Sequence, residues 1–210
     1  MTTTPRVHVV DDDAAVRDSL ALLLDAAGFA VRTYESAAAL LAVAGELEAG
    51  CVLTDVRMPD MDGLTLQRRL AALHRRLAVV VMTGHADVPI AVEALKAGAR
   101  DFLEKPFDDT RLIAVVREAL AISQRTQEEM QATAGIAQRL ASLTPREREV
   151  LDRLVAGQPN KTIAYDLGTS PRTVEVQRAR VMEKMHAHSL AELVRMVLAL
   201  ERSGSETSPG

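Results

Sequence analysis

The sequence predicts a doubly wound α/β domain with five parallel strands, followed by a small all-α domain. In the first part of the chain, five short apolar runs alternate with segments whose apolar residues recur every three or four positions. This alternation is typical of a parallel sheet with helices on both faces. Beyond residue 143 only helical patterns are predicted.

The five strands are expected at compact apolar runs, and each is followed by a helix. The expected strands are Val7–Val10, Ala30–Tyr34, Cys51–Leu53, Ala78–Met82 and Asp101–Glu104. The expected helices are Ala14–Ala27, Ala37–Ala44, Leu64–Leu73, Val88–Ala97 and one that begins at Asp108. Asp13 is placed to cap the first helix and Gly28 to end it, which is the usual distribution of these residue types.

The predicted domain boundaries are residues 1–124 for the α/β domain and 143–202 for the helical domain, with a helical linker at 125–142. The linker is polar and alanine-rich, and we expect a break at Gly135. Residues 203–210 are small and polar and are expected to be disordered. The helices of the second domain are expected at Pro145–Ala156, Asn160–Leu167, Pro171–Met185 and Ser189–Leu200.

Composition excludes several classes of protein. A single cysteine excludes an intramolecular disulfide and a cysteine-rich metal site. The sequence has no signal-peptide pattern and no apolar run long enough to cross a membrane, so a cytoplasmic protein is expected. Residues 1–125 carry a net charge of −4 and residues 126–210 a net charge of zero. Any nucleic-acid site must therefore come from local clustering of basic residues in the second half.

Charged and polar residues follow four of the predicted strands. Asp11 and Asp12 come after the first, Asp55 after the third, Thr83 after the fourth and Lys105 after the fifth. The carboxyl ends of parallel strands meet at one edge of a sheet, where such folds bind ligands. Clustered carboxylates repel unless a cation lies among them, and Mg²⁺ prefers oxygen ligands of this kind. Each residue alone has a structural explanation, such as helix capping, but four strand ends together favour phosphoryl chemistry.

These residues resemble the receiver domain of two-component response regulators. The resemblance covers residues 5 to about 124 and rests on Val10-Asp-Asp-Asp13, Thr54-Asp-Val-Arg-Met-Pro59 with Gly63, Met82-Thr-Gly84 and Lys105-Pro-Phe107. It implies a flavodoxin-like fold in which Asp55 accepts phosphate from a sensor histidine kinase. It also implies Mg²⁺ bound by Asp11, Asp12, Asp55 and the backbone carbonyl of Arg57.

The same resemblance assigns two further roles. A cis peptide bond is implied between Lys105 and Pro106, with the Lys105 amine directed at the phosphoryl group. Thr83 and Phe102 match the pair that moves on phosphorylation, although Phe102 could equally be a core aromatic residue. The family is a phosphoacceptor regulator rather than an enzyme, although its aspartate takes part in phosphotransfer and self-dephosphorylation.

A phosphatase of the haloacid-dehalogenase type is the alternative enzyme, because it also uses an aspartate that follows a strand. That family needs a second aspartate two residues later as a general acid. Here that position is Arg57, which argues against the phosphatase.

The second domain contains a predicted helix-turn-helix. Two helices flank Gly168-Thr-Ser-Pro171, with Pro171 at the start of the second, where its missing amide hydrogen costs nothing. One face of that helix carries Val174, Gln177, Val181 and Met185. The residues expected to point outward are Glu175, Val176, Arg178, Ala179, Arg180 and Met182.

Residues 140–200 resemble the LuxR-type helix-turn-helix. The resemblance implies phosphate contacts from Asn160, Lys161, Arg172, Arg178, Arg180 and Lys184, and we count Thr173 among the DNA-binding residues. Glu175, Val176 and Ala179 are the candidates to face base edges in the major groove. Gln177 departs from the family, in which a histidine is common at this position.

Nearly the whole chain resembles FixJ-type response regulators, on Gly84-His-Ala-Asp-Val-Pro89 and Ser170-Pro-Arg-Thr-Val-Glu-Val176 together with the motifs above. The resemblance implies a FixL-type sensor kinase, promoter DNA and RNA polymerase as partners, and dimerisation with gene activation on phosphorylation, in nitrogen fixation or oxygen response. Relatives in dicarboxylate uptake, tetrathionate or aromatic catabolism leave the target genes open. A phosphorylation-independent DNA-binding protein and a phosphate sink for the kinase are further alternatives. The complete acidic set argues against the first, and the intact recognition helix against the second.

Overall fold

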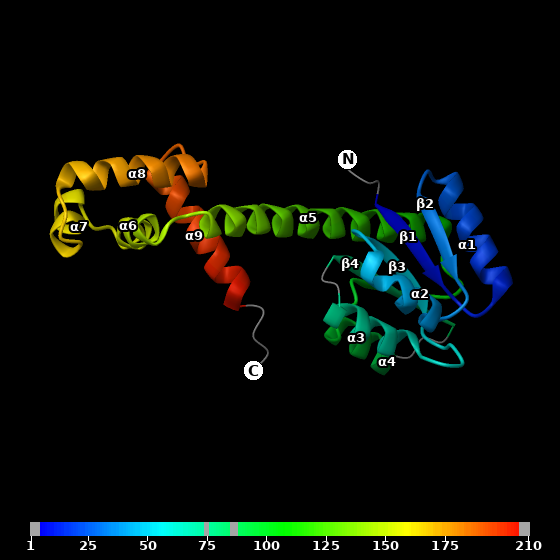
Figure 1. Cartoon of the computed structure of the whole chain (residues 1–210). Coiled ribbons are helices and arrows are strands. Elements are labelled where there is room, and N and C mark those ends of the chain that lie inside the picture. The colour runs from blue at the N-terminus through cyan, green and yellow to red at the C-terminus, as the bar shows by residue number, and fades with distance from the viewer. Residues whose placement is uncertain (1–4, 74–75, 85–87, 206–210) are drawn as a thin grey trace. The chain divides into compact units, whose positions relative to one another are not determined.

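The computed structural model describes residues 5–73, 76–84 and 88–205. The chain forms two compact units, Met1–Glu128 and Glu129–Gly210. Figure 1 shows the sheet with its helices in the first unit and the helices of the second.

The first unit is built on a five-stranded parallel sheet, as the sequence predicts. Its strands are β1 (Arg6–Val10), β2 (Ala30–Tyr34), β3 (Gly50–Asp55), β4 (Leu77–Thr83) and β5 (Asp101–Glu104). Their order is β2-β1-β3-β4-β5 and every neighbouring pair is parallel. The strand order reverses between β1 and β3, so a crevice is expected beyond the carboxyl ends of these two strands.

Helices cover both faces of the sheet. On one face lie α2 (Ala37–Val43), the short η1 (Ala44–Glu46), α3 (Gly63–Leu73) and α4 (Val88–Lys96), and on the other α1 (Ala14–Ala26) and α5 (Asp109–Ala141). All of β3 is buried. A central strand enclosed on both sides explains why its apolar run is continuous rather than alternating.

The strand β3 is longer than the expected run Cys51–Leu53. Thr54 pairs with Val81, and Asp55 pairs with Met82 in β4. Backbone pairing therefore continues past the last apolar residue, because hydrogen bonding between strands does not depend on side-chain polarity. Asp55 is consequently the last residue of the strand and not the first of the loop.

The helix α5 continues without a break from Asp109 to Ala141, through the expected linker as far as that residue. The expected break at Gly135 is wrong, because Gly135 lies inside α5. A glycine costs a helix only about 1 kcal/mol relative to alanine, which does not by itself end a helix. Ile136 and Leu140 pack against the core of the second unit, and this packing favours the helical conformation. The division between the two units, after Glu128, also falls within α5.

The second unit consists of helices around a small apolar core. After the last part of α5 come α6 (Pro145–Val155), α7 (Asn160–Asp166), α8 (Pro171–Met185) and α9 (Leu190–Ser205). The core is formed by Val150, Leu151, Leu154, Ile163, Ala164, Val174, Val181, Met185, Ala187 and Leu193.

The helix α9 extends through Ser205, so residues 203–205 of the expected disordered tail are helical. Extending an existing helix avoids the cost of nucleating a new one, which offsets the poor helix propensity of serine and glycine. Residues 206–210 lie outside the described residues. Within the described part of the chain, no helix is long and apolar enough to span a membrane.

Candidate functional site

The carboxyl ends of β1, β3 and β5 bring three charged side chains together. Lys105 Nζ lies 2.8 Å from Asp11 Oδ2 and 2.7 Å from Asp55 Oδ1. Asp11 is 2% exposed and Asp55 is 8% exposed. Two buried carboxylates therefore share one ammonium group, and the cluster keeps an excess of negative charge.

Backbone groups hold both carboxylates in place. The Arg57 N–H donates to Asp55 Oδ2 at 2.6 Å, and the Asp13 N–H donates to Asp11 Oδ1 at 3.0 Å. Gly63 begins α3 directly against Asp55, and a Cβ atom there would collide with the Asp55 carbonyl oxygen. Glycine is therefore required for the β3–α3 loop to return so close to the strand end.

Lys105 is held in its charged form. Burial lowers the pKa of its ammonium group, but hydrogen bonds and charge attraction from Asp11 and Asp55 outweigh this, so that the pKa is raised. The amine thus carries a fixed positive charge at neutral pH. The expected cis peptide bond between Lys105 and Pro106 is confirmed.

Thr83 and Phe102 lie on the strands next to this cluster. Thr83 is the last residue of β4 and is 1% exposed, and its carbonyl oxygen accepts from the Lys105 N–H at 2.7 Å. Phe102, in β5, is half-buried and packs against the apolar cluster beneath α2, α3 and α4. The two residues thus lie on adjacent, paired strands.

The residues expected to bind Mg²⁺ are only partly gathered. Asp11 and Asp55 are close to a common cation, whereas Asp12 is exposed. Among the described residues, no three acidic, histidine or cysteine side chains are grouped closely enough to hold a metal ion. The chemistry of the donors nevertheless fits Mg²⁺, because they are hard oxygen ligands with uncompensated negative charge.

In the second unit, α7 and α8 form the expected helix-turn-helix. The turn contains Gly168, whose φ of 61° lies in the left-handed region that favours glycine. Ser170 caps α8 by accepting from the Thr173 N–H at 3.1 Å, and Pro171 occupies the first helical position. The beginning of α8 is therefore sharply defined.

The helix α8 has one buried face, formed by Val174, Val181 and Met185. Gln177, which was expected on the same face, is half-buried. The candidate DNA-binding residues Arg172, Thr173, Glu175, Val176, Ala179 and Arg180 are exposed, and Arg178 is half-buried. Lys161 in α7 is also exposed, while Asn160 is half-buried.

Both units match known protein families. Residues 7–117 match the response regulator receiver domain, and residues 141–197 match the bacterial regulatory proteins of the luxR family. The transcriptional regulatory protein FixJ of Azorhizobium caulinodans is 58% identical over 91% of each chain. The chain is a response regulator of the FixJ type. Membership implies a sensor kinase as a partner and DNA as a ligand.

Two further comparisons show how widely this architecture is shared. The solved structure of the response regulator StyR is 39% identical and has a TM-score of 0.84, covering 93% of this chain and 98% of that one. The C4-dicarboxylate transport transcriptional regulatory protein DctR of Rhodobacter capsulatus is 46% identical over 90% of this chain and 98% of its own. The receiver family generally binds Mg²⁺ at its phosphorylation site.

Lys184 was expected to contact DNA phosphates, but its ammonium group makes contacts within the second unit. Its ammonium group is 2.6 Å from Glu147 Oε2 and donates to the Ser142 carbonyl oxygen at 3.4 Å. Glu147 is 3% exposed, and its carboxylate also accepts from the Thr144 N–H at 2.8 Å. Lys184 therefore ties the end of α8 to the beginning of α6.

Glu147 was missed by the sequence reasoning, although a signal for it was present. Thr144 and Glu147 have the spacing of a capping box, in which a threonine and a glutamate cap a helix reciprocally.

Met182 was expected to point outward but packs against the apolar core of the second unit. Near the end of α8 the buried face of the helix is therefore wider than the spacing of its apolar residues predicts.

Proposed function

We propose that Asp55 accepts a phosphoryl group from a phosphohistidine of a sensor kinase. The observation that carries the proposal is the shared ammonium group of Lys105 between Asp11 and Asp55. An Asp55 carboxylate oxygen would form a bond to phosphorus as the phosphorus–nitrogen bond breaks, and the released imidazole would take up a proton. Lys105 offers a positive charge to the phosphoryl oxygens during this transfer.

Mg²⁺ is the cofactor that we propose for this site, held by Asp11, Asp12, Asp55 and the carbonyl oxygen of Arg57. When bound, it would neutralise charge on the phosphoryl oxygens. The protein itself positions the acceptor, through the Arg57 N–H and Lys105, and keeps Asp55 largely shielded from water.

The response to phosphorylation is proposed to pass through Thr83 and Phe102. Added negative charge at Asp55 would draw the Thr83 hydroxyl toward it and allow the Phe102 ring to move inward. The face between residues 88 and 119 would then become a dimer surface. Converting a mostly inactive population into a mostly active one requires about 5.5 kcal/mol of difference between the two states.

The output is proposed to be promoter binding by α8 that activates transcription with RNA polymerase. Arg172, Arg178 and Arg180 would contact phosphates, together with Thr173, Asn160 and Lys161. Glu175, Val176 and Ala179 would face base edges, because an acidic group can accept from cytosine and small apolar groups suit thymine methyls. Lys184 is left out, since it is engaged with Glu147.

The first experiment is the solution mass of the full chain with Mg²⁺, with and without beryllofluoride, which stands in for the phosphoryl group on Asp55. We expect a monomer that becomes a dimer, and no such change in Asp55→Ala. A dimer under every condition would favour phosphorylation-independent DNA binding. A monomer that never responds would contradict dimerisation as the switch.

The base-reading role has its own test. Glu175→Ala should change the preferred base at one position of the binding site, whereas Lys161→Ala should weaken binding to all sequences alike. Selection of binding sites from a random DNA library measures both. An unchanged preference in Glu175→Ala would remove this residue from the proposed interface.

We propose the nitrogen-fixation or oxygen-responsive genes, with a FixL-type kinase, as the pathway. The likeness to DctR favours a second candidate, the control of dicarboxylate uptake. Phosphotransfer from purified kinases of both classes separates the two. Faster transfer from a dicarboxylate-responsive kinase would overturn the first choice.

A further inference from the structure

A cavity lies at the end of the sheet away from Asp55. It has a volume of about 250 Å³ and is lined by Arg6, His8 and Arg32, by Glu46 and Glu48, and by the apolar side chains of Val43, Leu47 and Ala49. Arg6 begins β1, whereas Asp11 follows the other end of this strand. The cavity and the phosphoacceptor cluster are therefore separated by the length of β1.

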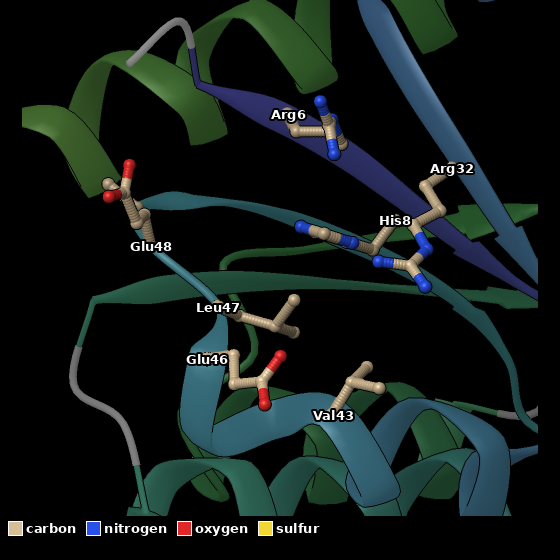
Figure 2. Close-up of a pocket in the computed structure, with 8 residues that line it drawn as sticks. Arg6, His8, Arg32, Val43, Glu46, Leu47 and Glu48 are labelled. Atoms are coloured by element: carbon tan, nitrogen blue, oxygen red, sulfur yellow. The ribbon is translucent and has the colours of Figure 1, made fainter. Parts of the chain in front are cut away.

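The parallel register brings the three basic side chains together. His8 in β1 is paired with Arg32 in β2, and Arg6 lies two residues before His8 on the same face of the sheet. Figure 2 shows these side chains above the segment that contains Val43, Glu46 and Leu47. Three nitrogen-bearing groups thus line one wall of a cavity whose other side is partly apolar.

The cavity lining carries two guanidinium groups, those of Arg6 and Arg32, and two carboxylates, those of Glu46 and Glu48. In the described part of the chain neither Arg6 nor Arg32 has an ion-pair partner, although Arg32 lies 5.3 Å from the centre of the Tyr34 ring. His8 is 3% exposed, and its Nδ1 is 3.1 Å from the Tyr34 hydroxyl oxygen. Burial, and then the charges of Arg6 and Arg32, lower the pKa of His8 to about 4.

We propose that Arg6, His8 and Arg32 form a binding site for a small oxyanion, a carboxylate or a phosphate group. Guanidinium groups bind both through paired hydrogen bonds. A cavity of about 250 Å³ has room for a small carboxylate or phosphate ion. Glu46 and Glu48 are exposed at the cavity and their charge opposes the binding of any anion, so binding would depend on the contacts with the two guanidinium groups.

The wall of this cavity is connected to α5. The Ala49 N–H donates to Gln127 Oε1 at 2.9 Å, and the next N–H, of Gly50, donates to Ser123 Oγ at 2.8 Å. A bound anion that shifts Ala49 would change how this turn of α5 is held. The site would therefore provide an input that is separate from Asp55 and does not depend on its phosphorylation.

The test is a titration of the full chain at pH 7 with inorganic phosphate, and separately with acetate, followed by amide NMR at constant ionic strength. We expect saturable shifts at Val43, Leu47, Ala49 and Gly50, and the anion that saturates at lower concentration identifies the class. Arg32→Gln should weaken binding about tenfold or more, because it removes a charge-assisted contact. Arg69→Gln, an exposed arginine of α3, is the matched control and should change nothing.

Shifts that do not saturate, or that persist in Arg32→Gln, would overturn the proposal. Arg6→Gln provides a second variant that alters the same wall from β1. Each variant should still respond to beryllofluoride, so a failure here is distinguishable from a failure at Asp55. Shifts at Ser123 and Gln127 in the saturated protein would show the connection to α5, and their absence would refute it.

Discussion

Each unit of the regulator contains a lysine bound to a buried carboxylate, but the two arrangements differ in their balance of charge. In the first unit Lys105 is shared by Asp11 and Asp55, whereas in the second Lys184 serves Glu147 alone. The Glu147 carboxylate is also satisfied by the Thr144 N–H. The shared lysine leaves an excess of negative charge in the first unit, whereas the one-to-one pair is balanced and holds two helices together.

The largest expected effect is at the shared lysine. Lys105→Ala should abolish the change in DNA affinity caused by beryllofluoride, because it removes the positive charge that contacts the group bound to Asp55. The loss of one charge-assisted hydrogen bond weakens binding of that group by about tenfold or more. DNA binding with and without beryllofluoride measures the effect, and Arg69→Ala is the control. If this variant responded to beryllofluoride like the original chain, Lys105 would have no role in the response and would not differ from Lys184 in this respect.

The second prediction concerns the one-to-one pair. Lys184→Met should lower the free energy of unfolding by about 2 kcal/mol, because it leaves the buried Glu147 carboxylate without its charged donor. Hydrogen exchange of α6 and α8 in the full chain measures this loss. Arg180→Met, at an exposed position of the same helix, should leave the exchange nearly unchanged.

A third prediction separates exposed cations from the engaged one. Arg180→Gln should reduce the slope of log affinity against log salt by about 0.9, as expected for one lost phosphate contact. Lys184→Met should leave that slope unchanged once folding is accounted for. Equal slopes in the two variants would mean that Lys184 also contacts DNA.

The smallest expected effect is the dependence of stability on pH. Hydrogen bonds from Lys184 and Thr144 lower the pKa of Glu147 below its ordinary value of 4.5. A lowered carboxyl pKa stabilises the fold above about pH 4.5, and this contribution is lost as the pH falls through the folded pKa. Lys105 has a raised pKa, so its contribution is present below about pH 10.5 and is lost at higher pH.

Hydrogen exchange across both pH ranges tests these opposite signs. The second unit should weaken in acid and the first in base. Lys184→Met should reduce the acid effect, and an undiminished effect in this variant would show that other carboxylates cause it.

Much of the fold, and the grouping of Asp11, Asp55 and Lys105, could be predicted from local patterns. The strands and helices follow from apolar spacing, and Asp11, Asp55 and Lys105 lie at strand ends that a parallel sheet must bring to one edge. The outward positions of Glu175 and Val176 followed from the helical period in the same way. These predictions succeeded because the period of an element fixes which side a residue occupies.

Only the tertiary structure decided the remaining features, since they depend on segments distant in the sequence. Lys184 meets Glu147 across 37 positions, and Met182 is buried by neighbouring segments of the second unit. The cavity beside His8 exists because register pairs it with Arg32 and because η1 passes over that face. The sequence by itself determined which residues share an element and a face, whereas the packing of those elements decided which charges meet.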